Sequence, residues 1–190
     1  MKTLSRVLAC ASGKLAGLYI IFNFVANDAG KEYGITYLRK LKLARRIIKI
    51  TEKIKSLTKW QQHLLLVEEI FRVPKSLKGD IVECGCYNGA STASLSLACA
   101  LTNRKLIVCD SFEGNPKPKE NENHDVSPIF KQGYWLWEEG EFSSEGGLDG
   151  VKKNIEKFGD IEVCQFIKGY YKDTLCHVKF LTLHWYNSAG

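Results

Sequence analysis

The sequence contains no cysteine pair with the spacing of a zinc site or of a redox motif. Cys84 and Cys86 are separated by one residue rather than two, and no second Cys/His pair has a matching spacing. The seven cysteines are scattered among predicted strands and helices, at positions 10, 84, 86, 99, 109, 164 and 176. This odd, scattered set argues against zinc and against a disulfide framework, and it predicts a cytoplasmic protein with reduced thiols.

A run of apolar residues long enough to span a bilayer is also missing. Such a span needs about 20 residues, whereas the stretch 15–26 is shorter and is interrupted by Asn23. The small residues that would follow a secretory signal are represented only weakly, at 25–27. We therefore expect a helix packed on the domain, and contact of residues 15–26 with a membrane is the less favoured alternative.

An extreme charge is absent as well. A net charge of +6, with 45% hydrophobic and 25% charged residues, is typical of an ordinary soluble globular protein. Residues 37–57 combine many cations with apolar positions at helical spacing, which predicts a basic amphipathic helix. Its cations could attract nucleic acid or an anionic membrane, but no aromatic interleaving or recognised binding module accompanies them. We favour a solvated or oligomer-facing helix and expect no nucleic-acid partner.

The stretch DIVECGCYNG, residues 80–89, organises the rest of the chain. A short β-prone run leads into Glu83, and Gly85 and Gly89 bracket three residues before a helix-compatible segment, 90–101. This order predicts a strand, a tight turn and a helix. Such a turn needs glycine where φ is positive or where a ligand presses on the backbone, and the N–H groups that open the helix form an anion site.

The stretch KLIVCDSFEG, residues 105–114, opens with a second β-rich run that ends in Asp110. An acid that closes the second strand about 20 residues beyond the glycines is placed to accept both hydroxyls of an adenosine ribose. The glycine turn and the distal acid together predict a nucleoside cofactor.

The details of the turn indicate which cofactor. A dinucleotide fold requires G-x-G-x-x-G, whereas this chain has E-x-G-x-x-x-G, with Cys86 and Asn88 where a pyrophosphate needs small residues. The acid would repel phosphates but suits an ammonium and a sulfonium, and the helix N-terminus with Ser91 can hold a carboxylate. We predict S-adenosylmethionine, with an ordinary βα turn as the alternative. Ser91 is expected to contact the cofactor, to cap the helix, or to do both.

Three motifs in order, VECGCYNGAST, CDSFEGNPKP and IKGYYKDTL, resemble S-adenosylmethionine-dependent O-methyltransferases of the macrocin and mycinamicin type, over roughly Trp60 to Leu175. The resemblance implies an α/β fold with a Rossmann-like class I methyltransferase sheet. It implies methyl transfer to a hydroxyl of a sugar or another small-molecule acceptor, by in-line displacement and often with magnesium. The expected cofactor-binding residues are Glu83, Gly85, Tyr87, Asn88, Gly89, Ser91, Asp110 and Ser111.

We expect two regions, an N-terminal helical region at 1–58 and an S-adenosylmethionine-binding α/β domain at 59–190. The remaining elements of the domain are expected as helices at 60–72 and 148–158, a third strand at 161–167, and a helix capped by Asp173. His63 is interpreted as structural. The polar segment 113–150 is expected to cover the acceptor, with His124 and Asp125 as candidates for contact.

Acidic residues are missing from the last part of the sequence. The resemblance places magnesium-binding acids just after a fourth strand, yet the corresponding stretch 180–188, FLTLHWYNS, contains no Asp or Glu, and none follows Asp173. We therefore expect no metal ligands, a domain truncated at its C-terminal end, a catalytic residue that stays unknown, and cofactor binding without methyl transfer. The alternatives are a noncatalytic cofactor-binding or interaction protein, a nucleotide-dependent oxidoreductase and a basic surface-binding protein.

Overall fold

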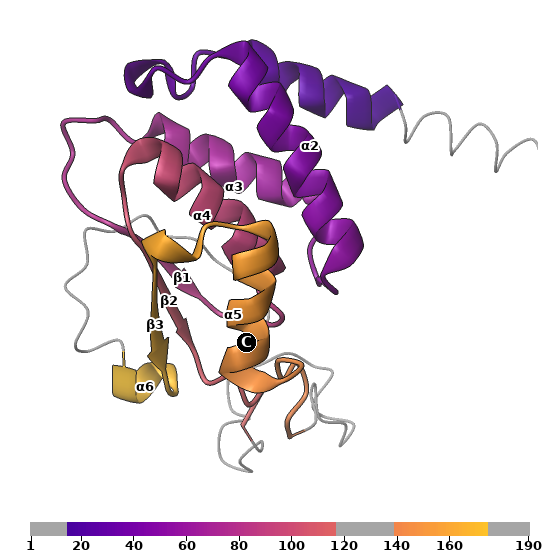
Figure 1. Cartoon of the computed structure of the whole chain (residues 1–190), viewed down its shortest axis with the longest axis vertical. Coiled ribbons are helices and arrows are strands. Elements are labelled where there is room, and N and C mark those ends of the chain that lie inside the picture. Colours follow the sequence, from indigo (N-terminus) through magenta and orange to yellow (C-terminus); the bar gives the residue numbers. More distant parts are fainter. Residues whose placement is uncertain (1–14, 117–138, 175–190) are drawn as a thin grey trace, which may run out of the picture.

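A parallel three-stranded sheet is the framework of the part of the chain that the computed structural model describes, residues 15–116 and 139–174 (Figure 1). The strands are β1 (Ile81–Cys84), β2 (Leu106–Asp110) and β3 (Cys164–Lys168), in the order β1-β2-β3. Their Ile-, Val- and Leu-rich runs suit a parallel sheet covered by helices. The predicted α/β, Rossmann-like class is confirmed for these residues.

The register brings the carboxyl ends of the strands to one edge of the sheet. Cys84 at the end of β1 lies opposite Cys109 of β2, and Asp110 lies opposite Lys168 at the end of β3. Ligands of open α/β sheets bind outside the carboxyl ends of the strands. The predicted glycine turn and Asp110 therefore lie at the edge where a ligand is expected.

Three helices pack side by side on the sheet, and a fourth packs on α3 and α4 (Figure 1). They are α3 (Trp60–Arg72), α4 (Ala90–Thr102), α5 (Gly147–Phe158) and the outer helix α2 (Tyr37–Lys53). α4 contacts β2 and lies between α3 and α5. Its Ala- and Ser-rich sequence permits this close approach, and nearly all of its side chains are buried. The helix predicted at 60–72 is confirmed at both ends, and those at 90–101 and 148–158 are each longer by one residue.

The N-terminal part packs on α3 and α2. A helix over residues 15–26 places the Phe24 ring on that of Phe71, with centroids 6.3 Å apart. Lys40 of α2 is buried and donates to the backbone oxygen and to Oδ1 of Asn27, each at 2.7 Å. A 3-10 turn, η1 (Lys31–Tyr33), joins the two helices. The expected packed helix is present, and no helix within 15–116 and 139–174 is both long and apolar enough to cross a membrane.

The basic helix ends earlier than predicted. α2 stops at Lys53 rather than at residue 57, since Ile54 adopts an extended conformation and buries its side chain. The Ser56 hydroxyl then accepts a hydrogen bond from the Thr58 backbone N–H at 3.2 Å. Such local side-chain bonds compete with the helix, and the hydrophobic pattern did not reveal this competition.

Two predictions near the third strand are wrong. The strand begins at Cys164 rather than at 161, because η4 (Ile161–Val163) forms a 3-10 turn opened by the Asp160 side chain. Asp173 is not a helix cap, since it lies inside the short helix α6 (Tyr171–Thr174).

Candidate functional site

The glycine turn between β1 and α4 has the backbone conformation that its sequence predicts. Gly85 and Gly89 have φ of 87° and 82°, which only glycine adopts readily, and Tyr87 also has a positive φ, 49°. The Gly85 N–H donates to the Cys109 backbone oxygen at 2.9 Å, so the turn is tied to β2. Gly89 is the N-cap of α4.

Gly89 is also needed for packing. A Cβ at this position would lie 3.0 Å from Cγ1 of Val151 and 3.7 Å from Ile155, both on α5. The glycine thus lets α5 approach the turn closely. In dinucleotide-binding turns, one glycine allows close packing of the helix against a strand. Here Gly89 allows a similar close packing between the start of α4 and α5.

Glu83 is a buried acid beneath the turn. Its Oε1 accepts a hydrogen bond from the Ser91 hydroxyl at 2.5 Å, whereas Oε2 is buried without a partner among the described residues. Burial raises the pKa of this carboxyl to about 7, against the opposing effect of the Ser91 and Thr92 hydroxyls. The structure therefore brings Ser91 to Glu83, and the alternative in which Ser91 caps α4 is wrong because Gly89 holds that position.

Asp110 reaches back from the end of β2 to the glycine turn. Its Oδ2 accepts from the Cys86 N–H and its Oδ1 accepts from the Phe112 N–H, both at 2.6 Å. Each carboxylate oxygen can accept a second bond. The predicted contact with ribose hydroxyls thus stays a prediction, and the structure adds a second task, since Asp110 holds the turn in place.

Tyr87 and Asn88 bind protein segments that follow in the chain. The Tyr87 backbone oxygen accepts from the Ser144 hydroxyl at 2.5 Å, and the Tyr87 ring meets Phe142 edge-on, with centroids 6.2 Å apart. The Asn88 Oδ1 accepts from the Glu145 N–H at 2.7 Å. These contacts dock the segment before α5 on the turn, so the predicted cofactor role of Tyr87 and Asn88 competes with a structural one.

Ser111 shapes the chain after β2. Its hydroxyl donates to the Gly114 backbone oxygen and accepts from the Glu113 N–H, at 3.1 and 3.2 Å. The candidates His124 and Asp125 lie outside the described residues.

Tyr171 is a site residue that the sequence reasoning missed. Its Oη would lie 3.0 Å from a Cβ on Gly85, so the phenol covers the first glycine of the turn. Although Tyr171 is 43% exposed, partial burial and the negative charge of Asp110 raise the pKa of its phenol, which is therefore a hydrogen-bond donor at neutral pH. Its position just after the third strand could have indicated that Tyr171 lies near the turn, because the carboxyl ends of parallel strands lie at the same edge of a sheet.

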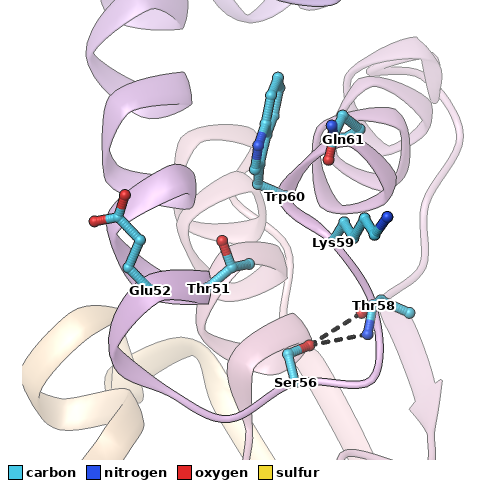
Figure 2. A pocket seen from close by; sticks show the side chains of 7 residues that line it. All are labelled: Thr51, Glu52, Ser56, Thr58, Lys59, Trp60 and Gln61. Atoms are coloured by element: carbon cyan, nitrogen blue, oxygen red, sulfur yellow. Dashed lines mark hydrogen bonds between the residues drawn. The ribbon is translucent and has the colours of Figure 1, made fainter. Parts of the chain in front are cut away.

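A separate cavity of about 360 Å³ lies between the end of α2 and the start of α3 (Figure 2). None of the predicted cofactor-binding residues lines it. Its lining residues are Thr51, Glu52, Ser56, Thr58, Lys59, Trp60 and Gln61. This cavity is therefore not the predicted cofactor site.

His63 connects the rim of that cavity to α4. Its Nε2 lies 2.8 Å from Thr58 Oγ1 and its Nδ1 lies 2.9 Å from Ser94 Oγ. The Ser94 hydroxyl donates to the Ala90 backbone oxygen, so Nδ1 carries the hydrogen and Nε2 accepts from Thr58. Burial lowers the pKa of His63 to about 4. The ring is neutral, fully buried and hydrogen-bonded, as a structural histidine should be.

The residues at the carboxyl edge fit a ligand that carries both a cation and a carboxylate. The unpartnered Oε2 of Glu83 calls for a hydrogen-bond donor or a proton, because an isolated buried carboxylate is costly. The amide groups that open α4 have no acceptor inside the helix and favour an anion. In contrast, residues 15–116 and 139–174 contain no group of three His, Cys, Asp or Glu side chains that could hold a metal ion. The stretch 180–188, where the resemblance places magnesium ligands, lies outside these described residues.

Comparisons with known proteins found a family model and a solved structure that are similar to this chain. A family model described as macrocin-O-methyltransferase (TylF) matches residues 58–185, a range that includes every predicted cofactor-binding residue. No curated protein matches the chain. Among solved structures, the chain is similar to "Crystal Structure of CalS11, Calicheamicin Methyltransferase", with a TM-score of 0.46 and 17% identity. That alignment covers 72% of this chain and 60% of the other, so the chain spans about 60% of that relative's length.

Proposed function

Because the chain belongs to the macrocin-O-methyltransferase (TylF) family, we propose that it binds S-adenosylmethionine and serves O-methylation of a small-molecule hydroxyl, such as that of a sugar. The observation that carries this proposal is the meeting of Glu83, the glycine turn and Asp110 at one edge of the sheet. Two acids and a helix N-terminus around one turn match the two cations, the ribose and the carboxylate of that cofactor.

The described residues would hold and orient the cofactor. When bound, S-adenosylmethionine supplies an electrophilic methyl group on its sulfonium. Glu83 would accept from its ammonium, the opening amides of α4 would hold its carboxylate, and Asp110 would accept from ribose hydroxyls. Tyr171, above Gly85, would close the site on the side of β3. Positioning of this kind lowers the barrier by fixing the reacting atoms in line.

A second candidate is a family member that binds the cofactor without transferring the methyl group. The observation that favours it is the composition of 180–188, which contains no carboxylate where the resemblance expects magnesium ligands. Incubation with S-adenosylmethionine, magnesium and a panel of sugar and glycoside acceptors separates the two. Metal-dependent formation of S-adenosylhomocysteine supports the enzyme, and its absence despite cofactor binding supports the second candidate.

Calorimetry tests the cofactor site directly. We expect S-adenosylmethionine to bind the wild-type chain, and Glu83→Gln or Asp110→Asn to weaken binding at least about tenfold, since each removes a charged acceptor. Glu156→Gln changes an exposed acid on α5 and serves as the matched control. Tighter binding of NAD than of S-adenosylmethionine, or equal affinity in all variants with the fold intact, would contradict the proposal.

A further inference from the structure

Two thiols lie side by side directly beneath the glycine turn. Cys84 is the last residue of β1, and Cys109 is its register partner on the neighbouring parallel strand. Neighbouring strands run about 4.8 Å apart, and register partners point to the same face. A disulfide requires a Cα separation of about 4.4–6.8 Å, so the strand register places these two residues within reach of a bridge.

The two thiols differ in protonation and in access. The neighbouring Cys109 thiol holds the pKa of Cys84 below its usual value. The same interaction, together with burial, raises the pKa of Cys109. Cys84 is half-buried, whereas Cys109 is fully buried. Cys84 is therefore the thiolate that a small reagent reaches first, because the thiolate is the reactive form.

The other cysteines among the described residues lack this combination. Burial raises the pKa of Cys86 and of Cys99, and it raises that of Cys164 to about 12. Cys164 is half-buried like Cys84, but its thiol donates to the Asp160 backbone oxygen at 3.4 Å. These thiols stay protonated at neutral pH, and Cys164 provides a natural comparison.

We propose that Cys84 and Cys109 form a peroxide-reactive dithiol, a modification site that closes to a disulfide between β1 and β2. The Cys84 thiolate attacks one oxygen of a hydroperoxide, forming a sulfenic acid and releasing hydroxide or alkoxide, which takes up a proton. The Cys109 sulfur then attacks the Cys84 sulfur, and water leaves with the Cys109 proton. With hydrogen peroxide, two thiols and one oxidant give one disulfide and two waters, so the thiols are oxidised by two electrons.

The bridge would act on the turn above it. The Gly85 N–H donates to the Cys109 backbone oxygen, and the Cys86 N–H donates to Asp110. Register partners of neighbouring strands stand about one strand spacing apart, about 4.7–4.9 Å, whereas a disulfide holds the Cβ atoms about 3.5–4.5 Å apart. Closing the bridge thus pulls Cys84 toward β2 and shifts the start of the turn. Any loss of S-adenosylmethionine affinity on oxidation rests on the proposed function, but the change in the turn does not.

The experiment begins with the reduced full chain. It is treated with hydrogen peroxide, and free thiols are then blocked and the chain is mapped by tryptic peptides. We expect a cross-link, reversed by dithiothreitol, between the peptide 79–104 and the peptide that contains Cys109. Because 79–104 also holds Cys86 and Cys99, fragment ions must assign the bond to Cys84. Oxidation of Cys84 without this bond, or a bond to another cysteine, would overturn the proposal.

Variants and a second readout complete the test. Cys84→Ser and Cys109→Ser should abolish the cross-link, whereas Cys164→Ser should leave it unchanged. Cys109→Ala should also slow alkylation of Cys84 by iodoacetamide severalfold, because Cys109 no longer lowers the pKa of the Cys84 thiol. Hydrogen exchange of residues 84–90 should change when the wild-type chain is oxidised and should return on reduction. Unchanged exchange in a cross-linked chain would overturn the link to the turn, whether or not S-adenosylmethionine binds.

Discussion

At the scale of single residues, Asp110 and Glu83 differ in the hydrogen-bond donors that the folded chain supplies to their carboxylates. Asp110 has two backbone N–H donors, so its charge is compensated within the protein. Glu83 has one hydroxyl donor and an unpartnered oxygen. Of the two, Glu83 therefore has the greater need for a bound cation, and it is the residue whose titration should report on ligand binding.

The first prediction concerns the pH dependence of stability. The pKa of Glu83 rises from 4.5 to about 7 on folding. Its neutral form therefore stabilises the fold below pH 4.5, and this contribution disappears as the pH rises through 7, with an amplitude of about 3 kcal/mol. Glu83→Gln should lack this loss, so its free energy of unfolding relative to wild type should increase between pH 4.5 and 8. Urea unfolding across this range, with Glu156→Gln as control, measures the difference; parallel curves would contradict the assignment.

The second prediction concerns Lys40, which is 1% exposed. Its ammonium donates two hydrogen bonds to Asn27 and lies 5.7 Å from the centroid of the Phe24 ring. Lys40→Ala leaves both acceptors of Asn27 without this donor and should lower the free energy of unfolding by about 2–4 kcal/mol. Lys42→Ala, at an exposed position on the same helix, should change it by less than about 0.5 kcal/mol. Equal effects in chemical denaturation would show that the buried contact is unimportant.

At the scale of elements, α4 connects the cofactor turn to the rest of the core. Its N-cap is a glycine with positive φ, its first turn is joined to His63 through Ser94, and its buried faces contact α3, α5 and β2. Small side chains make these contacts possible because they let backbones approach closely. We therefore expect a substitution at either end of α4 to alter the glycine turn.

The third prediction separates backbone strain from packing at the start of α4. Gly89→Ala places a Cβ at positive φ and 3.0 Å from Val151 Cγ1, whereas Gly34→Ala places one at φ 69° with no atom within 4 Å. Gly34→Ala should cost about 1–2 kcal/mol from conformation alone. Gly89→Ala should cost at least about 1 kcal/mol more, because overpacking adds to it. Thermal and urea unfolding of both variants measure the loss in the free energy of unfolding. Equal losses would mean that α5 shifts to accommodate the added Cβ at little cost.

At the scale of the whole molecule, two kinds of surface lie on the outer helices. α2 exposes a row of cations, Arg39, Lys42, Arg45, Arg46, Lys49 and Lys53. The helix over 15–26 exposes an apolar stripe, Leu15, Leu18, Tyr19 and Phe22, each 64–67% exposed. This stripe is where the less favoured membrane contact of residues 15–26 would form, whereas the possible homo-oligomer contact was predicted for the basic helix.

The fourth prediction concerns the cations of α2. They should bind polyanions only weakly, with a dissociation constant for duplex DNA no lower than about 10⁻⁶ M at physiological salt, because surface cations alone make salt-sensitive contacts. Fluorescence anisotropy at about 50 and 200 mM salt measures both the affinity and its steep fall. Tight duplex binding that survives physiological salt would show that α2 is a nucleic-acid site after all.

The sequence by itself determined the features that local chemistry dictates. The spacing of apolar residues predicted both ends of α3 correctly. Gly85 and Gly89 indicated backbone positions with positive φ, because a side chain disfavours that conformation. The bounds of α2 and β3 were less well predicted, since short polar side chains and a 3-10 turn altered the local hydrogen bonds. The sequence also predicted that Glu83 and Asp110 serve one site, and the structure brings both to the same edge of the sheet, where their role stays a prediction.

Only the tertiary structure decided what these residues touch. Strand register placed Cys84 beside Cys109, and it allowed Asp110 to reach the Cys86 amide. The packing of α5 decided that Gly89 must lack a Cβ, and the return of the chain after β3 brought Tyr171 over Gly85. Such contacts join residues that are far apart in the chain, so no local period or propensity encodes them. They follow from burying the helices against a sheet whose strands all end at the same edge.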